Sequence, residues 1–172
     1  MTARHLAQVF AVAVFLAAAH GTSSGQTAAK APAASPLASG QAAGTLTAKG
    51  RTVKLTYAAA FVDQTDKKKP IVLLVTEQPV PSANWKSHSD LMTYHRNTAP
   101  IVGVVFRLDA DREIDTAEYF VEKFPTSTSG IFQLSLDGPP GKSLSGTLKS
   151  SAVAAKLNEP VSLNATFNAT LK

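Results

Sequence analysis

The chain has 172 residues, no cysteine and a formal net charge of +5 at pH 7. The lack of cysteine excludes disulfide bonds, a thiolate nucleophile and a zinc–sulfur site, so a hydrophobic core must hold the fold together. The positive charge is mild and dispersed, since only residues 67–69 form a run of lysines, and it indicates no more than a weak attraction to anionic surfaces.

Residues 1–19 have the layout of a secretory signal peptide. Arg4 provides a basic start, an apolar run extends from Leu6 to Leu16, and residues 17–19 are alanines that form a small-residue exit. The apolar run is shorter than the about 20 residues that a membrane-spanning helix needs. We therefore expect cleavage near residue 19 and a secreted or periplasmic protein without a transmembrane span, with a retained N-terminal anchor as the alternative. Export also argues against nucleic acid as a partner.

Residues 20–43 consist mainly of Ala, Ser, Gly, Thr, Gln and Pro, and Leu37 is the only large apolar residue among them. Such a segment cannot bury enough apolar surface to offset the entropy lost on ordering. We interpret it as a disordered linker and expect one folded domain over residues 44–172.

Most of this domain alternates between apolar and polar residues, which is typical of half-buried strands. The alternation is clearest over residues 161–171, which predict one long antiparallel strand. Near the start of the domain, the residues expected to share one face are Val53, Leu55, Tyr57, Ala59 and Phe61. Two nearly continuous apolar runs, Ile71–Val75 and Ile101–Phe106, predict central strands that are covered on both faces.

Residues 113–124 fit two patterns. Ala117, Tyr119 and Val121 alternate as in a strand, whereas Ile114, Ala117, Val121 and Phe124 follow a helical stripe. We favour a strand, because "DADRE" directly after "VVFRL" is typical of a hairpin turn.

The two ends of the domain resemble each other. "GTLTAKGRTVKLTYAAAFV" and "GTLKSSAVAAKLNEPVSLNATFNATL" both read as a short strand opened by Gly-Thr-Leu, a turn and a long alternating strand. We expect these terminal hairpins to pair and to close the sheet, since closure removes exposed strand edges.

The opening segment "GTLTAKGRTVKLTYAAAF", followed by "PIVLLVTEQPVP", resembles a group of uncharacterised secreted bacterial β-rich proteins. The resemblance extends through "SGIFQLSLDG" to the C-terminal strand. It implies a β-rich fold and secretion, but no activity and no functional residues.

The segment "NWKSHSDLMTYHR", residues 84–96, contains the only tryptophan and two of the four histidines. Ser82 or Asn84 can cap a helix here, just after the turn "QPVP", and we expect one short helix near residues 83–96. A helix laid over a sheet would bury Trp85 and Met92 first. The candidate ligand-binding residues lie along this segment: Trp85, His88, Tyr94 and His95.

The geometry of a helix does not favour a metal or catalytic site built from residues of this segment alone. His88 and His95 are separated by about 10 Å along a helix axis, whereas each ligand of a zinc ion lies about 2 Å from it. Asp90 points away from His88, because residues two apart in a helix differ in direction by about 200°. We therefore favour a packing helix over a catalytic one.

Acidic residues alternate in the segment "DADREID", which places oxygen ligands at the spacing that calcium uses. The candidate metal ligands are Asp109, Asp111, Glu113 and Asp115. However, Ile114 and Phe120 occupy the positions where a calcium loop has its Gly and its last Glu. An acidic turn without any cofactor is the simpler interpretation, and calcium is the alternative.

These features predict an all-β fold with minor α content: an antiparallel β-sandwich or flattened barrel of about seven or eight strands with one short helix. The expected function is an exported, non-catalytic binding or structural module of the bacterial cell envelope, whose partner is an envelope protein, a peptide or a glycan. The alternative is a small extracytoplasmic hydrolase that uses His88 or His95 with an acid from residues 109–115. We favour a non-enzyme, because neither a Gly-x-Ser-x-Gly nor a His-Glu-x-x-His motif is present.

Overall fold

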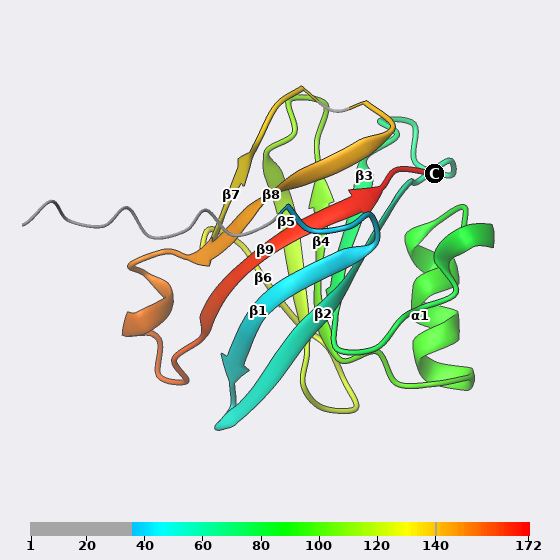
Figure 1. Cartoon of the computed structure of the whole chain (residues 1–172). Helices are drawn as coiled ribbons and strands as arrows, with labels where there is room; N and C mark the ends of the chain where they lie inside the picture. Colours follow the sequence, from blue (N-terminus) through cyan, green and yellow to red (C-terminus); the bar gives the residue numbers. More distant parts are fainter. Residues whose placement is uncertain (1–35, 140) are drawn as a thin grey trace, which may run out of the picture. The chain divides into compact units, whose positions relative to one another are not determined.

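The protein is described by a computed structural model that covers residues 36–139 and 141–172. The expected signal peptide and residues 20–35 of the expected linker lie outside these ranges. The described chain is a mainly β domain with one α-helix, which confirms the predicted fold class (Figure 1). The first strand begins at Gln41, so residues 41–43, which we had expected in the linker, belong to the sheet.

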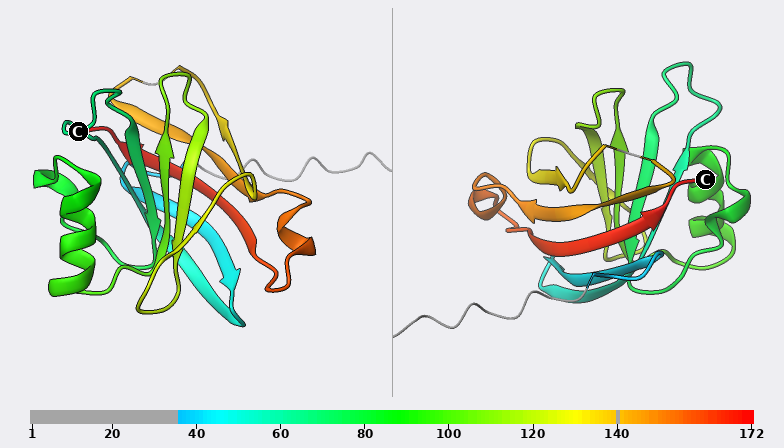
Figure 2. Two further views of the ribbon diagram at one scale, coloured as in Figure 1. Left: turned by 180° about the vertical axis from the view of Figure 1, so that it is seen from behind. Right: turned by 45° about the horizontal axis from the view of Figure 1, so that its top comes forward.

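The nine strands of the described ranges form one antiparallel sheet with the order β6-β5-β4-β3-β2-β1-β9-β8-β7. This sheet curls into a half-barrel (Figures 1 and 2). The strand additional to the predicted seven or eight is β6, a three-residue segment of Thr and Ser that carries no apolar alternation. The strands are β1 (Gln41–Ala48), β2 (Arg51–Val62), β3 (Ile71–Thr76), β4 (Gly103–Leu108), β5 (Ile114–Phe120), β6 (Thr126–Thr128), β7 (Phe132–Leu136), β8 (Ser143–Ser150) and β9 (Ser162–Thr170).

The ambiguous segment 113–124 contains strand β5, as predicted, with its neighbours β4 and β6 both antiparallel to it. The two terminal hairpins also pair, through β1 and β9, with Leu46 opposite Leu163. They do not close the sheet, however. They lie in its middle, and the edges of the sheet are β6 and β7.

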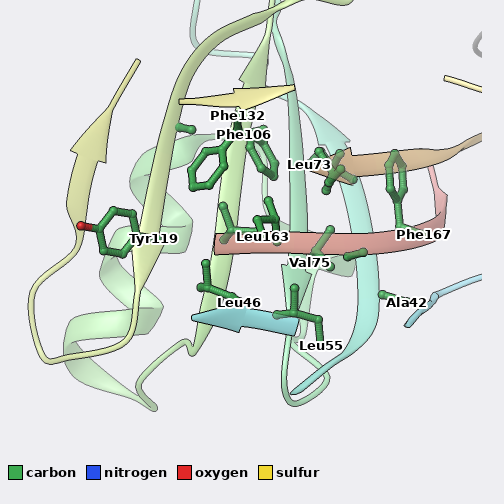
Figure 3. Packing of buried hydrophobic residues seen from close by; sticks show 14 of the residues in the cluster. Ala42, Leu46, Leu55, Leu73, Val75, Phe106, Tyr119, Phe132, Leu163 and Phe167 are labelled. Atoms are coloured by element: carbon green, nitrogen blue, oxygen red, sulfur yellow. The ribbon is translucent and has the colours of Figure 1, made fainter. Parts of the chain in front are cut away.

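A hydrophobic core fills the concave side of the curled sheet. Figure 3 shows side chains from β1, β3, β4, β7 and β9 that point toward one another across it. Phe106 of β4 and Phe132 of β7 meet edge to face, with ring centroids 5.7 Å apart and an angle of 82° between the rings. Because β4 and β7 are far apart in the strand order, this contact holds the curled sheet together across its hollow side.

Strand β2 changes face part of the way along. Val53 and Leu55 belong to the concave core, as predicted, but Tyr57 is 39% exposed and Ala58 is buried in that core instead. The physical reason is a register shift in the β1–β2 pair between Gln41 and Gly44, which offsets the alternation by one residue. Beyond the shift, the expected common face is wrong, and Phe61 packs on the opposite side of the sheet.

The helix α1 (His88–Asn97) covers this opposite side, as Figure 2 shows. A second apolar cluster lies between α1 and the sheet and contains Leu91 of the helix together with Val72 and Leu74 of β3. All six residues of β3 are therefore buried, which confirms the prediction that this strand is covered on both faces. Within the described ranges, no helix has the length and the apolar composition needed to cross a membrane.

The helix begins later than predicted. Residues 82–84 form a separate 3-10 turn, η1, and Trp85 after it is extended, with φ of −75° and ψ of 135°. The N-cap is Ser87 and not Ser82 or Asn84: its side chain accepts a hydrogen bond from the Asp90 N–H while the Asp90 carboxylate accepts one from the Ser87 N–H. This reciprocal capping box fixes the first turn of α1.

Candidate functional site

The four predicted ligand-binding residues lie in three different environments. Trp85 and Tyr94 form a half-buried aromatic pair, with ring centroids 5.4 Å apart, and Trp85 also contacts Phe61 edge to face at 6.1 Å. Both rings pack against the apolar cluster beneath α1. This pair therefore covers the core and is separate from both histidines of the predicted set.

His95 is buried and uses both ring nitrogens on backbone groups. Its Nδ1 accepts a hydrogen bond from the Ile101 N–H at 2.9 Å, and its Nε2 lies 2.9 Å from the Lys123 carbonyl oxygen. Because an N–H only donates and a carbonyl only accepts, the ring is neutral with its proton on Nε2. His95 thus ties together α1, the segment before β4 and the segment after β5.

His88 lies in a polar site on a different part of the domain. Its Nε2 is 2.8 Å from Oε2 of Glu118, whose other oxygen accepts a hydrogen bond from the Ser127 hydroxyl at 3.2 Å. The hydrogen bond from His88 lowers the pKa of Glu118 below its usual value, against the opposing effect of burial. The pair borders a polar hollow of about 440 Å³, which Arg107 and Thr116 also line.

This arrangement differs from a Ser-His-acid catalytic triad. In a catalytic triad the histidine stands between the hydroxyl and the acid, whereas here Glu118 stands between His88 and Ser127. The acid that contacts His88 belongs to β5 and not to the turn at residues 109–115. In the described ranges, neither His88 nor His95 is therefore hydrogen-bonded to an acid of that turn.

Asp63 is the polar residue of this region that sequence reasoning missed. It is only 3% exposed. One carboxylate oxygen accepts hydrogen bonds from the Thr65 N–H, the Thr65 hydroxyl and the Asp66 N–H, and the other accepts one from the His88 N–H at 3.1 Å. Burial raises the pKa of Asp63, but these hydrogen bonds outweigh it, and the net pKa lies below the usual value. The Asp-x-Thr spacing after a strand, typical of an Asx turn, was the available signal.

Of the four predicted metal ligands, Asp109 is engaged within its own turn. One carboxylate oxygen of Asp109 accepts hydrogen bonds from the backbone N–H groups of Asp111 and Glu113, and so closes the turn itself. Asp111, Glu113 and Asp115 are exposed. Among the residues that the structure describes, no group of three or more histidine or acidic side chains is placed to hold a metal ion. Calcium binding by this turn stays a prediction.

A second hollow lies where the C-terminal end of α1 meets the segment between β5 and β6. We call it the apolar hollow; it measures about 490 Å³, and the side chains that form it include Arg51, Arg96, Val102, Val121, Lys123 and Phe124. Phe124 is 72% exposed, the largest exposed fraction among the large hydrophobic residues of the described chain. An exposed aromatic ring beside a hollow of this size can contribute apolar contact area to a bound ligand.

Hydrogen bonds fix the walls of the apolar hollow. The Arg51 guanidinium donates to the Val121 carbonyl at one end of the segment, and His95 holds the Lys123 carbonyl two residues later. Glu122 between them forms an ion pair with Lys49 at 2.8 Å. The β1–β2 hairpin and α1 therefore fix residues 121–123, the segment that leads directly to Phe124.

His95 was predicted as a ligand-binding residue. Its buried ring lines the apolar hollow and links its walls through hydrogen bonds to backbone groups. Phe124 was named only in the helical stripe that was rejected, so its exposure was not anticipated. A search with the chain against protein-family models, curated proteins and solved structures finds no match, so neither a family nor a function follows from similarity.

Proposed function

We propose that the protein is an exported, non-catalytic binding module of the bacterial cell envelope and that the apolar hollow is its binding surface. The observation that carries this proposal is the exposed ring of Phe124 beside a preformed hollow of about 490 Å³. This volume falls within the roughly 300–1,000 Å³ that small-molecule sites usually have. The layout of residues 1–19 supports export.

The proposal of binding without catalysis is supported by what the histidines do. Both nitrogens of the His95 ring are bonded to backbone groups, so this ring has no lone pair or proton to offer a substrate. His88 shares its partner Glu118 with Ser127 in an order that does not activate the hydroxyl. Within the described ranges, no hydroxyl is hydrogen-bonded to either imidazole ring, whereas the apolar hollow needs no chemistry to act as a site.

A neutral apolar dye tests this function. We expect saturable binding of N-phenylnaphthylamine to the full chain, seen as an increase in dye fluorescence. The Phe124→Ala variant should bind about tenfold more weakly, because the ring contributes about 1.5 kcal/mol when it becomes covered by a ligand.

The matched control is Val153→Ala, which removes exposed apolar surface elsewhere, since Val153 is 56% exposed and belongs to a different part of the chain. Its affinity for the dye should stay within twofold of the unchanged protein. Equal affinities for Phe124→Ala and the unchanged protein would place binding elsewhere and refute the proposal.

A further inference from the structure

We propose that the ligand of the apolar hollow is an anionic amphiphile, a small molecule with an aliphatic body and a carboxylate head. This inference rests on the proposed function and names the class of ligand. It follows from the charges around the apolar hollow, which are independent of the exposed ring of Phe124.

Three cationic side chains stand around the apolar hollow: Arg51, Arg96 and Lys123. Its one acid, Glu122, is paired with Lys49 at 2.8 Å. In the described ranges, the three salt bridges involve none of the three cations, so they carry positive charge that no carboxylate within ion-pair distance offsets. The apolar hollow therefore combines apolar walls with a net positive rim.

The cations are placed next to the apolar surface. The Lys123 Nζ lies 5.7 Å from the centre of the Phe124 ring. The Nε of Arg96 donates to the Met92 carbonyl at 3.2 Å, which anchors the guanidinium at the last turn of α1. This hydrogen bond does not use the N–H groups of the two Nη atoms, which can donate to a ligand. A ligand whose chain packs on Phe124 thus has its head beside Lys123.

Charge and shape together select one kind of ligand. A neutral apolar molecule would fill the apolar hollow but leave the rim cations without a partner, and an organic cation would be repelled by them. A carboxylate on an aliphatic chain satisfies both parts, since a guanidinium or ammonium group binds carboxylates by charge-assisted hydrogen bonds. The ligand class follows from this complementarity.

The test compares three molecules with the same chain and different heads: octanoate, octan-1-ol and octyltrimethylammonium. Isothermal titration calorimetry with the full chain should show octanoate binding about tenfold more tightly than octan-1-ol, as expected for two partly exposed ion pairs. Octyltrimethylammonium should bind most weakly.

Substitutions locate the preference. The double variant Arg96→Gln, Lys123→Gln should bind octanoate and octan-1-ol equally, with the affinity for octan-1-ol unchanged. The matched control is Lys142→Gln, Lys149→Gln, which removes the same charge from exposed positions on and before β8. This control should keep the full tenfold preference, and near-native far-UV circular dichroism of both double variants shows that they fold.

Each outcome decides between the two proposals. Equal binding of octanoate and octan-1-ol to the unchanged protein would overturn the ligand class but leave the binding function intact. The ligand class is also overturned if octyltrimethylammonium binds best, or if the control double variant loses the preference as well. Absence of binding by all three molecules would contradict the proposed function itself.

Discussion

Replacing the buried Asp63 with alanine should destabilise the domain more than the loss of an exposed loop acid does. Asp63 accepts four hydrogen bonds and is 3% exposed. The donors on Thr65 and Asp66 can turn to water, because these residues are exposed or half-buried. The His88 N–H, at the first turn of α1, loses a charged acceptor in a partly buried place.

A hydrogen bond to a charged acceptor contributes about 1.5–3 kcal/mol, and the water-replaceable bonds contribute less. We therefore expect Asp63→Ala to lower the free energy of unfolding by about 3 kcal/mol. With a slope of about 2 kcal/mol per molar urea, the midpoint of urea unfolding falls by about 1.5 M. Circular dichroism during urea titration measures this shift.

Two companion variants separate the contributions. Asp63→Asn keeps one oxygen for the turn but presents an amide N–H₂ that cannot accept from His88, so its loss should be intermediate, about 2 kcal/mol. Asp111→Ala removes an exposed acid from another turn and should change stability by less than about 0.5 kcal/mol. If Asp63→Ala lost no more than Asp111→Ala, the hydrogen bonds of Asp63 would not hold the start of α1, and the reasoning would be refuted.

Three further predictions follow from burial, backbone geometry and charge. Leu91→Ala should cost about 3 kcal/mol in urea unfolding, because Leu91 is fully buried between α1 and the sheet, and an unchanged midpoint would mean that the helix is not seated there. Gly103→Ala should lower the thermal midpoint by about 10 °C or more, because φ is +146° and a Cβ would meet a β3 carbonyl oxygen at 2.3 Å; Gly138→Ala, with open space around it, should change it little. Stability should be fully present above about pH 4.5 and fall as the pH drops through the lowered pKa values of Asp63 and Glu118, since a depressed carboxyl pKa stabilises only the ionised form. Urea midpoints measured between pH 2 and 7 give the dependence of stability on pH. This dependence should be weaker in Asp63→Asn than in the unchanged protein, and an equal dependence would contradict the lowered pKa of Asp63.

The strands were predictable because apolar alternation is a local property of the chain. The two-sided burial of β3 follows from its continuous apolar run. The strand at residues 114–120 was predicted from the hairpin turn before it, because its own periodicity fits a helix as well. The pairing of β1 with β9 was predictable from the resemblance of the two ends. The position of the β1–β9 pair in the middle of the sheet could not be predicted from the sequence, because it depends on how the other strands pair.

The errors occurred where contacts between distant segments decide the conformation. Trp85 was expected in the helix, but the Ser87 capping box starts α1 three residues later, and Trp85 turns onto Phe61 instead. The face change in β2 follows from a register shift against β1 that no local pattern marks. A single run of alternating residues contains no information about the neighbour with which it must stay in register.

The candidate site was hardest to predict for the same reason. The apolar hollow is assembled from the end of α1, the segment after β5 and Arg51 at the start of β2. Phe124 entered the sequence analysis only as part of the helical stripe, which was rejected in favour of a strand, so its exposure was left open. Only the three-dimensional arrangement shows that its ring faces water.

A nuclear magnetic resonance titration of the ¹⁵N-labelled protein with octanoate shows whether the apolar hollow is the binding surface. We expect saturable shifts of the backbone amides of Val102 and of residues 121–124, which form the walls of the apolar hollow. The Trp85 indole N–H and the amides of β7 and β8 should remain unchanged. Shifts centred on Trp85 or on His88, or no saturable shift at all, would contradict the claim that this hollow is the binding surface.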